Sequence, residues 1–186
     1  MGIEVDVRDH GAVEATIARV VQEWGRVDVL VANAGAGRGR PVDTKASTLD
    51  PALLQLVTEM NLFGTIYCCN AVAPIMKQHR SGKIITVSSV AGIAPSLDGG
   101  YAHYGAAKAA IAHYTRYLTQ DLGPFGITVN RLARGVIATG GSWRRSFRAA
   151  FRVIGIEPSW LPFVGSEPSR IVPRSSNSLL QTCPIM

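Results

Sequence analysis

The sequence contains little cysteine and lacks long hydrophobic runs. Its three cysteines among 186 residues make neither a disulfide framework nor a metal-ligand spacing. No stretch approaches the ~18–20 consecutive apolar residues of a membrane-spanning helix, and the N-terminus lacks the basic and apolar regions of a signal peptide. We therefore expect a cytoplasmic protein with no metal site and no membrane partner.

Negative charge is scarce only in the last part of the chain. The net charge is +6, but residues 1–130 hold 11 basic and 11 acidic side chains. Residues 131–186 hold eight arginines against two glutamates, so the whole excess lies there. Those arginines lack the interleaved aromatic or glycine repeats of a nucleic-acid-binding segment, and we expect no nucleic-acid partner.

What the sequence does contain is a regular alternation of short apolar strands and longer helical patterns. Asp9 and Asp50 stand where a helix N-cap is needed, and Gly25 stands where a helix ends. A parallel sheet covered by helices on both faces produces this alternation, so we predict an α/β fold. The predicted strands cover residues 3–7, 27–31, 83–87 and 127–132, and the predicted helices cover residues 10–24, 50–78 and 101–122.

In such a sheet, ligands bind at the carboxyl ends of the strands. One of these ends is Asn33-Ala34-Gly35, whose small residues let a ligand approach the backbone. Chemistry is therefore expected where the strands end, at Asp6-Val7, Asn33-Ala34-Gly35, Ser88-Ser89 and residues 134–139.

Tyr104 and Lys108 are four residues apart in a predicted helix and therefore project from one face. An ammonium group near a phenol favours the phenolate, which makes Tyr104 a candidate general acid or base. Taken alone, such a pair is more often an ordinary pair on a helix surface. Ser89 follows a predicted strand, and its hydroxyl could polarise the same substrate oxygen, with Ser88 as the alternative. Asn61 lies inside a predicted helix, where an amide is locally unfavourable.

Together these segments resemble the classical short-chain dehydrogenases/reductases. They occur in the family's order and at nearly the family's spacing over residues 3–139. The matching segments are Asp6-Val7, Asn33-Ala34-Gly35, Met60-Asn61-Leu62, Val87-Ser88-Ser89, Tyr104-Gly105-Ala106-Ala107-Lys108 and residues 135–139.

The resemblance implies an oxidoreductase that interconverts alcohols and carbonyls with NAD or NADP, on a small or medium apolar substrate. Four residues would be catalytic. Tyr104 would exchange a proton with the substrate oxygen, and Ser89 would hydrogen-bond that oxygen. Lys108 would hold the nicotinamide ribose and lower the pKa of Tyr104, while Asn61 would help hold the water of a proton relay.

The resemblance also implies which residues bind the cofactor, in addition to Tyr104 and Lys108. Each stands at the carboxyl end of a predicted strand. Asp6 and Val7 would contact the adenine, Asn33, Ala34 and Gly35 would line the cofactor, and Ile137 and Thr139 would meet the carboxamide.

The sequence departs from the family at both ends. The family's glycine-rich turn, which places helix amides against the cofactor pyrophosphate, is not present, and residues 3–7 correspond to the family's third strand. We therefore expect a partial Rossmann-like, doubly wound parallel sheet lacking the first two strands, within a domain that covers residues 1–141. An Arg-, Ser- and Pro-rich tail covers residues 142–186. We expect weak cofactor binding and impaired activity.

An alternative is a non-catalytic fragment that associates with full-length family subunits. In the family, the helices at 50–78 and 101–122 commonly build the oligomer interface, so a homo-oligomer is expected through them. Cys68 and Cys69 are expected to be buried small hydrophobic residues, and His103 an ordinary core or solvated histidine.

Overall fold

The computed structural model describes residues 1–135 and residue 137. Three strands form a parallel sheet in the order β1-β2-β3. The register places Val29 opposite Lys83 and Gly82 opposite Ile127. The strands are β1 (Val29–Ala32), β2 (Gly82–Ser89) and β3 (Ile127–Arg134), and the α-helices of the described residues are α1 (His10–Trp24), α2 (Pro51–Thr58), α3 (Gly64–His79) and α4 (Ala102–Leu122).

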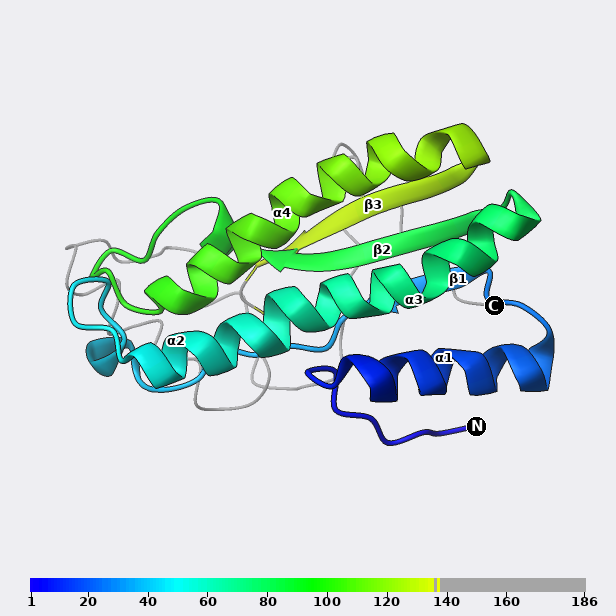
Figure 1. Ribbon diagram of the computed structural model, residues 1–186. Coiled ribbons are helices and arrows are strands. Elements are labelled where there is room, and N and C mark those ends of the chain that lie inside the picture. The colour runs from blue at the N-terminus through cyan, green and yellow to red at the C-terminus, as the bar shows by residue number, and fades with distance from the viewer. Residues whose placement is uncertain (136, 138–186) are drawn as a thin grey trace, which may run out of the picture. The chain divides into compact units, whose positions relative to one another are not determined.

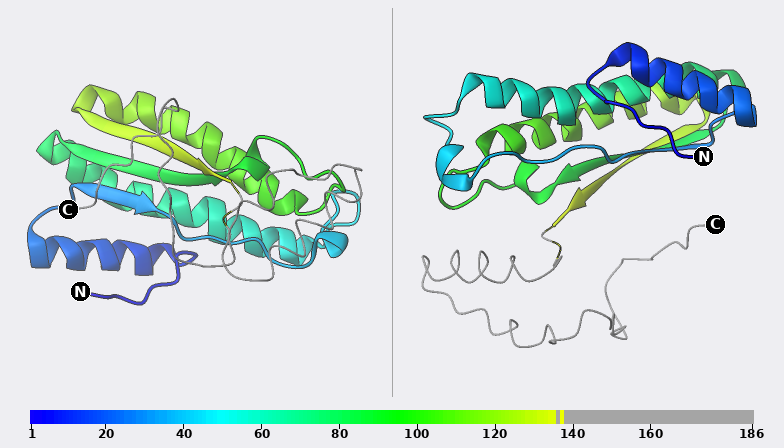
Figure 2. Two further views of the ribbon diagram at one scale, coloured as in Figure 1. Left: turned by 180° about the vertical axis from the view of Figure 1, so that it is seen from behind. Right: turned by 90° about the horizontal axis from the view of Figure 1, so that it is seen from below.

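The four helices lie on one side of the three strands (Figure 1; right panel of Figure 2). α3 packs on β1 and β2, α4 packs on β2 and β3, and α1 packs against α3. Strands that alternate with helices in one parallel sheet confirm the predicted α/β class and the Rossmann-like arrangement. Within residues 1–135 the helices cover a single face of that sheet, whereas the alternation of elements predicted helices on both faces.

Local capping explains where the first helices begin. The Asp9 side chain accepts a hydrogen bond from the Ala12 N–H at the start of α1. Gly25 ends that helix at φ 80°, a left-handed conformation that glycine adopts without strain. The Asp50 side chain accepts the Ala52 N–H at the start of α2. The predicted caps are confirmed.

The predicted helix over 50–78 is one continuous helix with an irregular turn at its centre. Glu59–Phe63 forms a π-helical turn between α2 and α3. Asn61 lies in it, and its side-chain Nδ2 donates to the carbonyl of Val57, one turn earlier. This amide competes for a backbone acceptor of the helix, and π-helical turns are frequent at functional sites. The irregular turn ends at Phe63, directly before Gly64.

The prediction of a strand at residues 3–7 is wrong. These residues form no strand and lead into a turn in which the Asp9 N–H donates to the carbonyl of Asp6. Alternating apolar and acidic residues favour an extended chain, but a strand exists only when a neighbour accepts its backbone hydrogen bonds. Within the described part of the chain, β2 is the only strand that pairs with β1. The strand expected at 27–31 is observed at Val29–Ala32.

The hydrophobic core lies between the sheet and the helices. Cys69, predicted to be buried, is fully buried there, and burial raises the pKa of its thiol to about 12, so it stays protonated. Cys68 is half-buried. Gly82 lets the Met76 side chain lie against β2, because a Cβ there would stand 2.4 Å from the Met76 sulfur. The core residues are Cys69, Val72, Met76, Ile84, Leu118, Leu122, Ile127 and Val129.

By length and mean hydropathy (1.2), the continuous helix Pro51–His79 could cross a membrane. Core helices of soluble proteins meet the same two criteria. Its residues Val57, Val72 and Met76 are fully buried within the described part of the chain. The length and hydropathy of this helix are therefore weak evidence for a membrane span.

Replacing Ile84 by alanine should lower the free energy of unfolding by ~2–5 kcal/mol, because its side chain fills the core between the sheet and the helices. Ile85→Ala is the matched control, since Ile85 is half-buried and faces the other side of the same strand. Denaturant titration of both variants measures the difference. An equal loss in the two variants would contradict the placement of the core.

Candidate active site

Tyr104 and Lys108 lie on α4 where this helix packs over the end of β2. The Lys108 Nζ lies 5.6 Å from the centroid of the Tyr104 ring and donates a hydrogen bond of 2.8 Å to the carbonyl of Val87. Lys108 is only 3% exposed. The lysine is therefore held behind the tyrosine by the backbone of β2 rather than extended into solvent.

The two serines at the end of β2 face different surroundings. Ser88 is buried, and its hydroxyl donates to the carbonyl of Lys108 at 2.7 Å. Ser89 lines the same pocket as Tyr104, and its Oγ accepts a hydrogen bond of 3.2 Å from the Ala91 N–H. Side chains alternate across a strand, so only one of two adjacent serines can face the pocket. That serine is Ser89.

Asn61 is fully buried and brings the π-helical turn close to Lys108. Its Nδ2 donates to the carbonyls of Ala36 and Val57, at 3.0 and 2.9 Å. Its Oδ1 has no partner among the described residues. A Cβ on Gly35 would stand 2.4 Å from that oxygen and 3.5 Å from the Lys108 Nζ, so only glycine fits there. Asn61, Gly35 and Lys108 therefore meet at one place.

A pocket of about 550 Å³ lies beside Tyr104. Four residues with hydroxyl groups line it, Ser89, Ser96, Tyr101 and Tyr104, and no charged side chain is among its described lining residues. The chain after β2 lies directly on α4, since a Cβ on Gly92 would stand 2.7 Å from the Ala109 nitrogen. Most of the remaining wall is small and apolar: Ala46, Val90, Ala91, Ile93, Ala94, Pro95, Ala102, Ala106 and Ala109.

The pKa of Lys108 is lowered from the ordinary value of a lysine. Burial, and secondly the positive charge of Arg134, lower the pKa of Lys108 to about 8. Arg134 ends β3 and lies opposite Ser89 in the sheet register. A lysine with a pKa near neutrality can change its charge in response to small changes around it.

A sequence profile of the short chain dehydrogenase family matches residues 1–147. The profile covers every residue placed above around the pocket. The chain belongs to the short-chain dehydrogenase/reductase family. The resemblance of the separate motifs is thereby confirmed.

Two curated relatives and one solved structure illustrate the similarity. A cyclohexanol dehydrogenase of Rhodococcus sp. (strain TK6) is 52% identical over 140 residues, which are 75% of this chain and 52% of that protein. The short-chain reductase protein NovJ of Streptomyces niveus is 42% identical over 138 residues, or 74% and 50%. NAD+-bound xylitol dehydrogenase superposes with a TM-score of 0.69 at 29% identity and covers 76% of this chain and 52% of its own. The chain spans about half the length of the curated relatives it matches.

The residues that the family resemblance assigns to the cofactor lie in several places. Asn33, Ala34 and Gly35 are exposed after the end of β1, and Gly35 adjoins Lys108. Ile137 is exposed, whereas Thr139 lies outside the described residues, as does the predicted tail over 142–186.

Asp6 and Val7, the expected adenine contacts, contact other residues of this chain in the structure. The Asp6 carboxylate accepts hydrogen bonds from the guanidinium and, secondly, from the backbone N–H of Arg8, and these lower its pKa to about 2. Val7 packs on the helix at Gly64, where a Cβ would stand 2.8 Å from the Val7 Cγ2. In this structure the Asp6 carboxylate is therefore hydrogen-bonded to Arg8 within its own turn.

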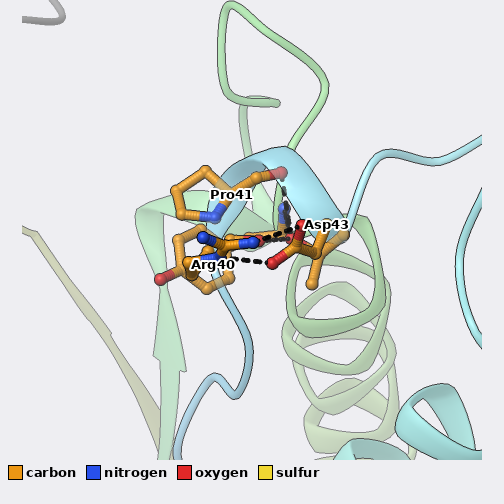
Figure 3. A network of polar contacts seen from close by, with 5 residues as sticks. Arg40, Pro41 and Asp43 are labelled. Atoms are coloured by element: carbon orange, nitrogen blue, oxygen red, sulfur yellow. Dashed lines mark hydrogen bonds and ion pairs between the residues drawn. The ribbon is translucent and has the colours of Figure 1, made fainter.

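The sequence did not reveal how the start of α4 is held. Thr44 is fully buried, and its Oγ1 accepts the Tyr101 N–H from 57 residues away. A short turn precedes it, in which the Arg40 guanidinium donates to the Asp43 carboxylate beside Pro41 (Figure 3). No local sequence pattern predicts a capping residue that lies 57 residues away in the chain.

The stability of the protein should depend on pH through Lys108. Its pKa is about 8 in the folded chain and about 10.5 when unfolded, so between these values the unfolded chain binds the extra proton. The free energy of unfolding should therefore rise from pH 8 to pH 10.5, by roughly 2 kcal/mol relative to a Lys108→Met variant. Denaturant titrations of both proteins across this range measure the difference.

Arg134→Gln is the control, since it removes the second cause of the shift and should reduce the pH dependence without abolishing it. Parallel pH profiles of the wild-type chain and Lys108→Met would contradict the assigned pKa.

Proposed function

We propose that this chain carries the catalytic residues of an NAD- or NADP-dependent dehydrogenase/reductase that interconverts an alcohol and a ketone. The observation that carries the proposal is that Ser89 and Tyr104 share one apolar pocket, with Lys108 buried behind the tyrosine. The hydroxyl groups of Ser89 and Tyr104, in a pocket without charged side chains among its described lining residues, suit a substrate with a single reacting oxygen. Membership of the family supports the reaction class.

The residues present fit the nicotinamide end of the cofactor. The Oδ1 of Asn61, which has no partner within the described part of the chain, and the absence of a Cβ at Gly35 leave space and a hydrogen-bond acceptor beside Lys108. Lys108, Asn33, Ala34 and Gly35 would hold the cofactor there. When bound, the nicotinamide donates or accepts the hydride of the reaction.

The chain's own residues supply the proton and orient the oxygen. Tyr104 donates a proton to the carbonyl oxygen during reduction and accepts it during oxidation. Ser89 donates a hydrogen bond to the same oxygen. A positive charge on Lys108 stabilises negative charge on the Tyr104 oxygen. Asn61, whose buried Oδ1 lacks a partner among residues 1–135, would hold the water of a proton relay.

The pocket wall supports an uncharged, small or medium apolar substrate. A carboxylate or phosphate would lose its hydration without meeting a positive side chain among the described lining residues. A volume of about 550 Å³ is ordinary for a small-molecule site. The 52% identity to cyclohexanol dehydrogenase supports a cyclic secondary alcohol as the first compound to test.

The 186-residue chain should bind the cofactor weakly, because its sequence does not contain the glycine-rich turn that places helix amides on the pyrophosphate. We expect dissociation constants for NADH and NADPH well above the micromolar range. Residual oxidation of cyclohexanol, measured at millimolar cofactor, should fall at least ~100-fold in Tyr104→Phe, because the proton donor is lost.

The same Tyr104→Phe variant should leave cofactor binding largely intact, as followed by nicotinamide fluorescence, because Lys108 and Asn33, Ala34 and Gly35 remain to hold the cofactor. Tyr117→Phe is the matched control, since that tyrosine is 67% exposed on α4. Equal turnover of wild-type and Tyr104→Phe chains would remove Tyr104 from its role. Micromolar cofactor affinity would contradict the proposed impairment.

A second candidate function is association with full-length subunits of the family, or with further copies, without catalysis. Exposed apolar side chains on the helices favour it: Leu54 and Phe63 on the helix Pro51–His79, and Tyr117 on α4, are 40%, 41% and 67% exposed. Such side chains are common at interfaces between subunits.

Size-exclusion chromatography of the chain mixed with a full-length relative tests this association. Co-elution should be lost in Phe63→Ser with Tyr117→Ser, because these changes remove apolar area from the proposed interface. A control with Trp24→Ser changes an equally exposed apolar residue of α1, outside the two helices. A chain that elutes alone as a monomer would exclude this candidate.

A further inference from the structure

The first turn of α4, which carries Tyr104, has no cap from its own neighbourhood. Tyr101 precedes the helix at φ 57°, a left-handed conformation, and its side chain makes no capping hydrogen bond. Thr44 replaces the local cap. Its Oγ1 accepts the Tyr101 N–H at 2.9 Å, and its carbonyl accepts the Ala102 N–H at 3.3 Å. Two donors at the helix start are therefore satisfied by one distant residue.

Thr44 is itself fixed in place. It is fully buried, and its hydroxyl donates to the carbonyl of Arg40 at 2.9 Å while accepting from Tyr101. A threonine hydroxyl can donate and accept at once, which valine of the same shape cannot. The hydroxyl thus joins the turn at Pro41–Asp43 to the start of α4.

His103 makes a second connection between the same two segments. Its ring is fully buried, and its Nε2 lies 3.0 Å from the carbonyl of Arg38. A carbonyl only accepts, so Nε2 carries the hydrogen, while Nδ1 has no partner among the described residues. The ring stacks on Tyr101, with centroids 6.1 Å apart and planes inclined by 12°.

These two connections place the loop of residues 37–44 directly beside the candidate proton donor. A Cβ on Gly37 would stand 3.7 Å from the Tyr104 Cγ and 3.5 Å from the Tyr101 ring. Gly37 therefore lies close to the Tyr104 ring, at a distance that a methyl group would just fill. A shift of the loop away from α4 would widen the space on that side of the ring and give the ring more freedom to rotate.

We propose that Thr44 and His103 are positioning residues for Tyr104: they hold the loop 37–44 against the first turn of α4 and thereby fix the Tyr104 ring at the pocket. The relevance of this to catalysis rests on the proposed role of Tyr104. Proton transfer requires its hydroxyl to be held within ~0.5 Å of a productive position. Neither residue touches the substrate in this role, since both act through the loop and the helix start.

The position of Tyr104 can be measured without turnover. The full chain is labelled with 3-fluorotyrosine, and among its five tyrosines the Tyr104 signal is assigned by its loss in Tyr104→Phe. Thr44→Val should shift and broaden that signal, because the Tyr101 N–H loses its acceptor. Thr44→Ser, which keeps the hydroxyl, should restore it.

Thr115→Val is the structural control. It removes a buried hydroxyl of the same helix, which lies 2.8 Å from the Thr86 hydroxyl. This variant should lower stability while leaving the Tyr104 signal unchanged. A Tyr104 signal that is the same in Thr44→Val and Thr44→Ser, or that moves equally in Thr115→Val, would overturn the proposal for Thr44.

The second pair of variants tests His103 and does not depend on whether Thr44→Val folds. His103→Gln keeps a terminal N–H donor for the Arg38 carbonyl, whereas His103→Met has the same length and no donor. Amide hydrogen exchange over residues 37–44 should be about tenfold faster in His103→Met, the factor expected when one hydrogen bond of ordinary strength is lost. His103→Gln should exchange close to wild type.

Equal exchange in His103→Gln and His103→Met would overturn the role of His103. These readouts stay separate from the test of function. Loss of the predicted effect of Tyr104→Phe on turnover would refute the catalytic role of Tyr104 and leave the fluorine signals and exchange rates as they are. An unmoved Tyr104 signal would refute the positioning role alone.

Discussion

The candidate site depends on two reciprocal hydrogen bonds that join α4 to the end of β2. The Lys108 ammonium donates to the Val87 carbonyl, and the Ser88 hydroxyl donates to the Lys108 carbonyl. Both lie in buried surroundings, where an unmade hydrogen bond costs more than it would in water. They fix the position of α4 relative to the end of β2. In this position Ser89 and Tyr104 line the same pocket.

The same attachment sets the electrostatics of the site. Holding an amine against a backbone carbonyl inside the protein removes it from water, and Arg134 adds a positive charge nearby; together they lower the pKa of Lys108 to about 8. The guanidinium of Arg134 thus adds a second cation close to Ser89, Tyr104 and Lys108.

Much of this arrangement could be predicted because its causes are local. The caps at Asp9 and Asp50, the strand that ends in Ser89 and the four-residue spacing of Tyr104 and Lys108 all act within one or two helical turns or one strand. The strand predicted at residues 3–7 failed for the opposite reason. Its alternating pattern is real, but strand formation depends on a neighbour that no pattern within those residues specifies.

The sequence by itself determined the order of the helices and strands from residue 10 onward and the residue types at the ends of these strands. Only the tertiary structure decided that Ser89 rather than Ser88 faces the pocket. It placed the amide of Asn61 within a π-helical turn, with an oxygen that has no partner among the described residues. It also decided that Thr44 caps a helix 57 residues away. The reason is physical: periodicity and capping act between neighbours in sequence, whereas a buried polar atom takes whichever partner the packing of distant segments brings within reach.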